Sequence, residues 1–111
     1  MTARATVSTH VLDASAGIPA RGVAVTLEHR DGDGEWAAAA RGSTDEDGRL
    51  RFGEPLPPGE WRLTFGTGEY FAARSVESFY PEVTITFRVL AGHYHVPLLL
   101  SPFAYSTYRG S

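Results

Sequence analysis

The sequence predicts an all-β sandwich. Short segments alternate apolar and polar residues, turn-forming Asp, Gly and Pro residues separate these segments at the spacing typical of sandwiches, and helical periodicity is almost absent. The chain has 111 residues, of which 42% are hydrophobic, with two Trp, six Phe and five Tyr. This length can bury one core and leaves no room for a second, so we expect a single domain over residues 1–111.

Eight segments have the alternating pattern of half-buried strands. They cover residues 5–12, 23–28, 37–41, 49–52, 61–65 and 83–89, and the stretches that begin at His93 and at Ala104. The first ends at turn-forming residues 13–17, and the second ends at the Asp-Gly pairs of residues 31–34, which supply the positive φ angles of hairpin turns. Periodicity alone allows strand or helix over 37–41, and the hairpin before it favours a strand.

The second half of the chain contains the one segment with a helical pattern. Residues 44–48 form a turn before the short edge strand at 49–52, and the Pro-rich residues 55–59 interrupt regular structure. A helix is expected over 69–78, with Pro81 barring its continuation. Two helical turns cannot anchor a helical domain, so we expect eight strands and one short helix.

Composition argues against several classes of partner. The net charge is −3 and all ten basic residues are Arg, so the chain lacks the basic field that binds nucleic acid. The chain contains no Cys, which excludes disulfides and thiolate metal sites and fits a reducing compartment. No segment resembles a membrane helix or a signal peptide. We therefore expect a cytoplasmic protein that binds neither membranes nor nucleic acid.

Histidines near the end of the chain are candidates for chemistry. His93 and His95 share one strand face, while Tyr94 and Val96 share the other. The alternation of the first strand turns His10 outward as well. A single strand histidine is usually structural, and His29 is interpreted in this way. Two histidines at i, i+2 beside a third change that balance, because imidazole is the usual general base near neutral pH.

Five segments carry a resemblance to a known family. They are Ser8–Asp13, Thr44–Arg49, Gly68–Phe71, Glu77–Glu82 and the tail from His93 to Ser111. Together they resemble the 5-hydroxyisourate hydrolases of the transthyretin-like family over nearly the full chain. The C-terminal Tyr-Arg-Gly-Ser is that family's signature. Transthyretin itself, a hormone carrier with the same fold, lacks the histidine and tetrapeptide pattern, so the resemblance favours the enzyme.

The resemblance implies a fold, an activity and an assembly. The fold is an eight-stranded transthyretin-like (prealbumin-like) β-sandwich with one short helix. The activity is hydrolysis of 5-hydroxyisourate to 2-oxo-4-hydroxy-4-carboxy-5-ureidoimidazoline in urate degradation, with no cofactor and no metal. The assembly is a homotetramer with active sites at the dimer–dimer interface. Ala104, where the family more often has Gly, is the one departure.

The resemblance also implies which residues form the site. The expected catalytic residues are His10, Arg49, His95 and Ser111, and the expected substrate-binding residues are Tyr108, Arg109 and Gly110. Water must attack a ring carbonyl while negative charge develops on oxygen, so a base and a cation are the minimum machinery. The base is His95, or His10 acting with His95, and the sequence leaves that choice open. Arg49 is expected to stabilise the anion, and Ser111 with its carboxylate to hold a histidine or the substrate.

Three alternatives remain at this point. His10 together with the His93 and His95 pair would supply three imidazole ligands to a zinc ion that activates water. A non-enzymatic small-ligand carrier on the same scaffold is the second alternative, because a fold does not fix a function. The third is a serine nucleophile, for which the sequence offers no clear activating Ser-His-Asp arrangement.

Overall fold

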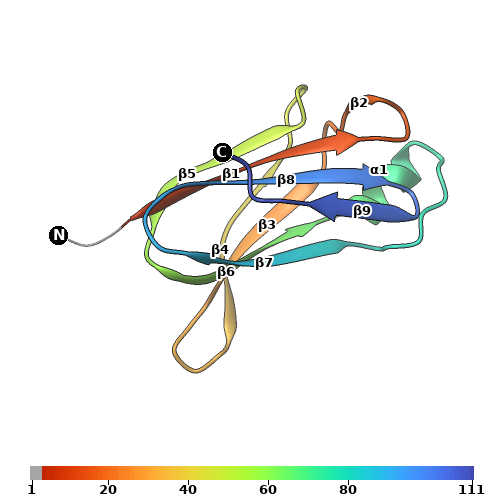
Figure 1. Cartoon of the computed structure of the whole chain (residues 1–111). Helices are drawn as coiled ribbons and strands as arrows, with labels where there is room; N and C mark the ends of the chain where they lie inside the picture. Colours follow the sequence, from red (N-terminus) through yellow and green to blue (C-terminus); the bar gives the residue numbers. More distant parts are fainter. Residues whose placement is uncertain (1–3) are drawn as a thin grey trace.

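The computed structural model describes residues 4–111 and consists of two β-sheets packed face to face (Figure 1). Its elements are β1 Ala5–Asp13, β2 Ile18–Pro19, β3 Ala24–Arg30, β4 Trp36–Ser43, β5 Arg49–Leu56, β6 Gly59–Phe65, α1 Thr67–Ala73, β7 Val83–Val89, β8 Gly92–Ser101 and β9 Ala104–Thr107. The all-β sandwich with one short helix is confirmed.

The two sheets draw on different parts of the chain. The first sheet has the order β2-β1-β8-β9, with β5 also paired to β1, and the second has the order β4-β3-β6-β7. Strands β1 and β8 are parallel, whereas all other pairs are antiparallel. The first sheet therefore places the N-terminal strand between β5 from the middle of the chain and β8 from its end.

Alternation along the strands separates the core from the outer faces. In β1 every second residue is buried, and the intervening residues are partly exposed on the opposite side. The fully buried side chains that fill the space between the sheets include Val7, Val11, Val25, Leu27, Leu63, Phe65, Leu98 and Leu100. Because this inner face is apolar, the polar residues of β1 and β8 lie on the outer face of the first sheet.

All eight expected strands occur, and two differences concern the edge of the first sheet. The two-residue β2 was not expected as a separate strand. Strand β5 continues to Leu56 through Pro55, although the Pro-rich stretch was expected to interrupt regular structure. That expectation was wrong for Pro55 because β5 pairs with β1 alone, so a residue without an N–H is tolerated at this edge.

The helix is shorter than expected and begins earlier. The sequence predicted residues 69–78, but α1 spans Thr67–Ala73. The chain leaves the helix at Ser75, which has a φ of 59°, and the N–H groups of Arg74 and Val76 both donate to the Phe71 carbonyl oxygen. These bonds satisfy a carbonyl group in the last turn of the helix and end the helix before its expected second half.

A buried hydrogen bond joins α1 to β1 at one end of the sandwich (Figure 1). The Tyr70 hydroxyl donates to Asp13 Oδ2 at 2.9 Å, and Asp13 Oδ1 accepts from the Ser15 hydroxyl at 2.7 Å and from the Ala16 N–H at 3.0 Å. Burial raises the Asp13 pKa, but these bonds and the charge of Arg74 together leave it below its ordinary value. Burial, with the Asp13 carboxylate beside it, raises the pKa of Tyr70 to about 12.

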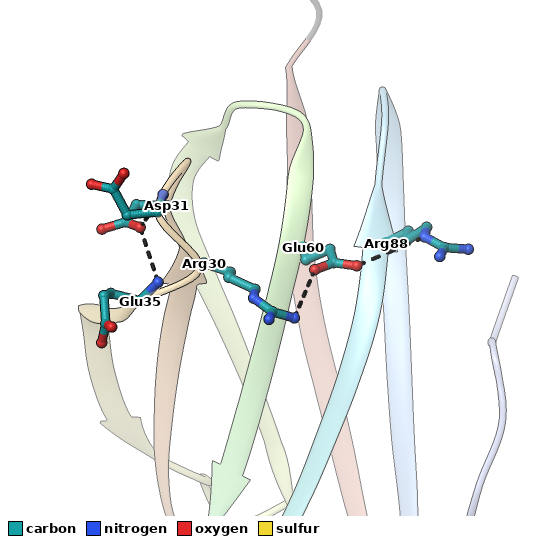
Figure 2. A network of polar contacts seen from close by, with 6 residues as sticks. Arg30, Asp31, Glu35, Glu60 and Arg88 are labelled. Atoms are coloured by element: carbon teal, nitrogen blue, oxygen red, sulfur yellow. Dashed lines mark hydrogen bonds and ion pairs between the residues drawn. The ribbon is translucent and has the colours of Figure 1, made fainter.

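The second sheet has a network of ion pairs (Figure 2). Glu60 on β6 lies between Arg30 on β3, at 3.2 Å, and Arg88 on β7, at 4.0 Å. These side chains are largely exposed, so each pair contributes at most about 1 kcal/mol. We interpret the network as a solvated face. No helix within residues 4–111 is long and apolar enough to cross a membrane.

Candidate active site

The strand register of the first sheet gathers polar residues on its outer face. His10 of β1 lies opposite Arg49 of β5, and Ser8 of β1 lies opposite His95 of β8. Because residues two apart on a strand share a face, Ser8 and His10 lie on the same side. The register therefore brings three expected catalytic residues together from distant parts of the sequence.

A cavity of about 500 Å³ opens on this face. Arg49, Arg51, His93, His95 and Ser111 all line it. Its volume lies within the range of sites that bind small molecules. A small ligand in this cavity would meet guanidinium, imidazole and carboxylate groups together.

An aspartate turn fixes the backbone at Arg49. Asp45 Oδ1 accepts the N–H groups of Asp47 and Arg49, each at 2.9 Å. Between them Gly48 has a φ of 75°, and its carbonyl oxygen accepts the Val11 N–H at 2.7 Å. A Cβ on Gly48 would lie 2.3 Å from the Val11 carbonyl oxygen, so this turn approaches β1 closely enough to exclude any side chain.

His10 is held by the same turn. Its Nε2 donates to the Asp47 carbonyl oxygen at 2.9 Å, which leaves Nδ1 as the other ring nitrogen. His10 lies next to the cavity. Its chain neighbour Thr9 and its partner across the strands, Arg49, both line the cavity. A nitrogen that donates to a carbonyl cannot act as a base, so only Nδ1 of His10 remains for that role.

The C-terminal tail packs directly on His95. The Gly110 N–H donates to the His95 carbonyl oxygen at 2.8 Å, and a Cβ at Gly110 would lie 2.6 Å from His95 Cδ2. In Figure 1 the tail turns back from β9 past β8. Gly110 thus allows the close approach that puts Ser111 in the wall of the cavity.

Tyr108 and Arg109 lie elsewhere. They line a second cavity of about 360 Å³ together with Phe87 of β7 and Tyr94 of β8. The Arg109 Cζ is 4.6 Å from the centroid of the Tyr94 ring, a cation–π contact on the opposite face of β8 from His95. The structure therefore separates these two residues from the first cavity, and their role in substrate binding stays a prediction.

The His95 imidazole has one nitrogen engaged and one available. Its Nδ1 lies 2.8 Å from the Ser8 hydroxyl, which is the one hydrogen bond of this ring within residues 4–111. Burial lowers the pKa of His95, and electrostatic interactions with His10, His93 and Arg49 lower it further. His95 is therefore neutral at pH 7, which is the form that accepts a proton.

Sequence reasoning missed several neighbours of the site. Ser8, Arg51 and Asp45 line the cavity but were not expected there. Ser8 precedes His10 by two residues and Arg51 follows Arg49 by two, so strand alternation was a signal that could have found both. Asp45 had a weaker signal, because its Asx turn is recognisable in sequence but its contact with the cavity depends on the packing of the turn.

The histidines do not form a metal site. Within residues 4–111, no group of three His, Cys, Asp or Glu side chains is arranged to hold a metal ion. His10 Nε2 donates to a backbone carbonyl, and His93 Nε2 and His95 Nδ1 both face the Ser8 hydroxyl. These orientations do not fit the three-imidazole zinc site considered as an alternative.

Comparisons with known proteins agree with this fold. The model of the HIUase/Transthyretin family matches residues 7–110. A 5-hydroxyisourate hydrolase from Salmonella dublin is 45% identical over 109 residues, covering 94% of this chain and 79% of that protein. The solved 5-hydroxyisourate hydrolase of Klebsiella pneumoniae superposes with a TM-score of 0.86 at 42% identity, covering 96% of this chain and 94% of the other.

A transthyretin from Sparus aurata shares the same fold. It superposes with a TM-score of 0.89 at 32% identity, over 94% of this chain and 95% of that structure. The fold similarity to this protein is as high as the similarity to the Klebsiella hydrolase. Residues of the site, and not the shape of the sandwich, must therefore separate the two branches of the family.

Proposed function

The chain belongs to the HIUase/transthyretin family, and from that premise we propose that it hydrolyses 5-hydroxyisourate in urate degradation by water activated at His95. One observation supports this mechanism most: His95, Arg49 and Ser111 surround one cavity on the outer face of the first sheet. A neutral imidazole and a guanidinium meet the needs of an acyl hydrolysis, in which a water loses a proton while a carbonyl oxygen gains charge.

The reaction begins with proton transfer from water. Nε2 of His95 takes a proton from a water molecule as its oxygen attacks the ring carbonyl carbon, which forms a tetrahedral anion. The C–N bond then breaks, and the ring nitrogen receives the proton that His95 held. The acyl carbon becomes a carboxyl group that loses its own proton at neutral pH. No cofactor and no covalent intermediate takes part in these steps.

Charge stabilisation falls to the cation of the site. Arg49 offers a planar fork of N–H donors that fits the oxyanion or the imide oxygens of the substrate. Ser111, which also lines the cavity, holds a histidine or the substrate in register. His10 is held beside Arg49 by the hydrogen bond from its Nε2 to the Asp47 carbonyl oxygen.

The test follows the substrate directly. Freshly generated 5-hydroxyisourate, formed from urate in the cuvette, is monitored by near-ultraviolet absorbance with and without the protein after dialysis against a chelator. Faster decay with the protein is expected. An unchanged decay rate would contradict the proposal, and restoration of activity by added zinc alone would replace it with the zinc mechanism. Unchanged decay accompanied by substrate binding would favour the carrier.

We also propose that the protein forms a homotetramer with active sites at the dimer–dimer interface. Edge strands support assembly, because β9 and β7 end their sheets with unpaired backbone groups. Large exposed apolar side chains lie on or near β9, including Phe103, Tyr105 and Tyr108. The cytoplasmic location stays a prediction from the sequence.

A further inference from the structure

A chain of hydrogen bonds runs behind His95 along the outer face of β1 and β8. The Ser8 hydroxyl lies 2.8 Å from His95 Nδ1 and 2.9 Å from His93 Nε2. On the far side of the same ring, His93 Nδ1 lies 2.7 Å from the Thr6 hydroxyl. Two imidazoles are thus bridged by one hydroxyl, and a second hydroxyl ends the chain near the surface.

The number of protons restricts this chain to two arrangements. Ser8 has one O–H, and each neutral imidazole has one N–H. If Ser8 donates to His93, then His95 Nδ1–H donates to Ser8, and His93 Nδ1–H donates to Thr6. If Ser8 donates to His95, every bond reverses and His95 carries its proton on Nε2. The first arrangement leaves Nε2 of His95 as a base, and the second makes it an acid.

We propose that Ser8 and His93 are positioning residues that hold His95 in the tautomer with Nδ1 protonated and Nε2 free to accept a proton. The inference rests on the proposed hydrolysis, in which Nε2 acts on water. Because Nδ1 points at Ser8, Nε2 is the nitrogen left for the cavity that Arg49 also lines. A lone pair beside the guanidinium is favoured over a second N–H, so the charge of Arg49 selects the base arrangement.

The chain also shares the charge formed during the reaction. Once Nε2 has taken a proton, Nδ1–H of His95 passes to Ser8 while the Ser8 hydroxyl proton passes to His93 Nε2. His93 is then the imidazolium, its Nδ1–H still donates to Thr6, and His95 is neutral with Nε2–H. One positive charge has moved one ring closer to solvent. When the relay reverses and Nε2 gives its proton to the leaving ring nitrogen, the first arrangement is restored.

Kinetics of matched variants test the role of the hydroxyl. Ser8→Ala should lower kcat about ten- to hundredfold with KM changed less than about twofold, because the hydroxyl that it removes is engaged by two histidine rings and orients a catalytic group. Ser8→Thr keeps the hydroxyl on a residue that strands favour and should recover most of kcat. Equal kcat values for Ser8→Ala and the unaltered protein, or no recovery in Ser8→Thr, would overturn the proposal.

A coupling measurement tests whether His93 acts through Ser8. His93→Phe keeps a ring at this exposed position without its nitrogens and should also lower kcat. Because both residues act in one chain, the double variant should lose little more than Ser8→Ala alone. Effects that multiply would show independent roles and would contradict the chain.

Nuclear magnetic resonance gives a readout that does not depend on turnover. With ¹⁵N-labelled histidine, the unaltered protein at pH 7.5 should show His95 protonated on Nδ1, and Ser8→Ala should shift it toward the Nε2-protonated form. The same tautomer in both proteins would overturn the proposal. If the unaltered protein failed to accelerate substrate decay, the proposed function would fail while the tautomer result would still decide the hydrogen-bond chain.

Discussion

His95 shows how the surroundings of one side chain set its chemistry. Strand alternation places it outside the core, yet Ser8 and Gly110 cover two of its edges. Partial burial and neighbouring positive charges lower its pKa below the ordinary value of 6.5. The neutral ring is therefore favoured at pH 7, and a neutral imidazole can accept a proton. An exposed histidine beside a carboxylate would instead have a raised pKa and would be charged more often at this pH.

His95→Asn should abolish most activity without unfolding the protein. Loss of the base should lower kcat about 10²- to 10⁴-fold, because a general base contributes a factor of that size. The matched control is His29→Asn on the second sheet, where the ring stacks on Trp61 at 4.2 Å and lies away from the cavity. Stopped-flow decay of the substrate measures kcat, and circular dichroism checks the fold. Near-normal turnover in His95→Asn would contradict the assignment of His95 as the general base.

The lowered pKa of His95 sets the acid side of the pH profile. Activity needs the neutral ring, so the midpoint of the acid limb of kcat/KM should lie below pH 6.5. The titratable and charged groups around His95 and its cavity are His10 from β1, Asp45 from the turn before β5, Arg49 and Arg51 from β5, and His93 from β8. The profile of kcat/KM between pH 5 and 8 measures the effect. An acid limb centred above pH 6.5 would contradict it.

Asp13 illustrates a buried charge used for stability. Its pKa is lowered in the folded state, so the stabilisation is present above the ordinary value of 3.8 and is lost as pH falls through the folded value. Asp13→Asn should reduce the free energy of unfolding by about 1–3 kcal/mol at pH 7, because a buried charge-assisted network is broken. Urea unfolding at pH 7 and pH 3 measures the difference, which should shrink at the lower pH. If the difference in unfolding free energy between the two proteins grew on acidification, this account would be contradicted. Tyr70→Phe is the control, because it removes only the hydrogen bond from the Tyr70 hydroxyl to Asp13.

Strand β1 is the element that joins core and site. Its inner residues Val7 and Val11 are buried, while Ser8 and His10 face outward beside β8 and β5. A slip of one residue would exchange the two faces, so the core burial of β1 also fixes the register of the site. The packing of the core and the positions of the site residues on β1 therefore depend on the same strand register.

The tail is the second element that shapes the site. Gly110→Ala would place a methyl carbon 2.6 Å from His95 Cδ2, so the ring or the tail must move. We expect kcat to fall at least about tenfold, since small displacements of a catalytic group are costly. The control is Gly53→Ala in β5, where a Cβ would have no neighbour within 4 Å. Steady-state kinetics of both variants decide the matter, and equal kcat values would show that the tail does not position His95.

The whole molecule has the candidate active site on one sheet and a network of ion pairs on the other. The outer face of the first sheet holds the cavity, whereas the second sheet holds the surface network of Figure 2. Exposed strand edges and aromatic side chains near β9 leave room for partner subunits. Assembly through these edges is therefore the prediction that concerns the whole molecule.

The proposed tetramer predicts a molecular mass. Light scattering coupled to size exclusion should give four times the 12.0 kDa of one chain at micromolar concentration. Apolar side chains such as Phe103, which is 61% exposed, would then become covered. A monomer or dimer of full activity would contradict an active site that needs the dimer–dimer interface.

Local sequence patterns were sufficient to predict the alternating strands, the turns between them and the outward direction of His10, His93 and His95. These features are local, since the two-residue strand period and the φ preferences of Gly and Asp operate within a few residues. The resemblance of the Thr44–Arg49 segment and of the tail to a known family added Arg49 and Ser111 to the expected site. The sequence misjudged Pro55 and the ends of α1, where pairing partners and a terminal turn override local preference.

The tertiary structure was needed to establish which of these groups lie close together. Register across β5, β1 and β8 puts Arg49 beside His10 and Ser8 beside His95, although these residues are up to 87 positions apart. Packing also sends Tyr108 and Arg109 to a different cavity from Ser111, three residues or fewer away. Such relations depend on hydrogen bonds between distant strands, and no periodicity within a single segment encodes them.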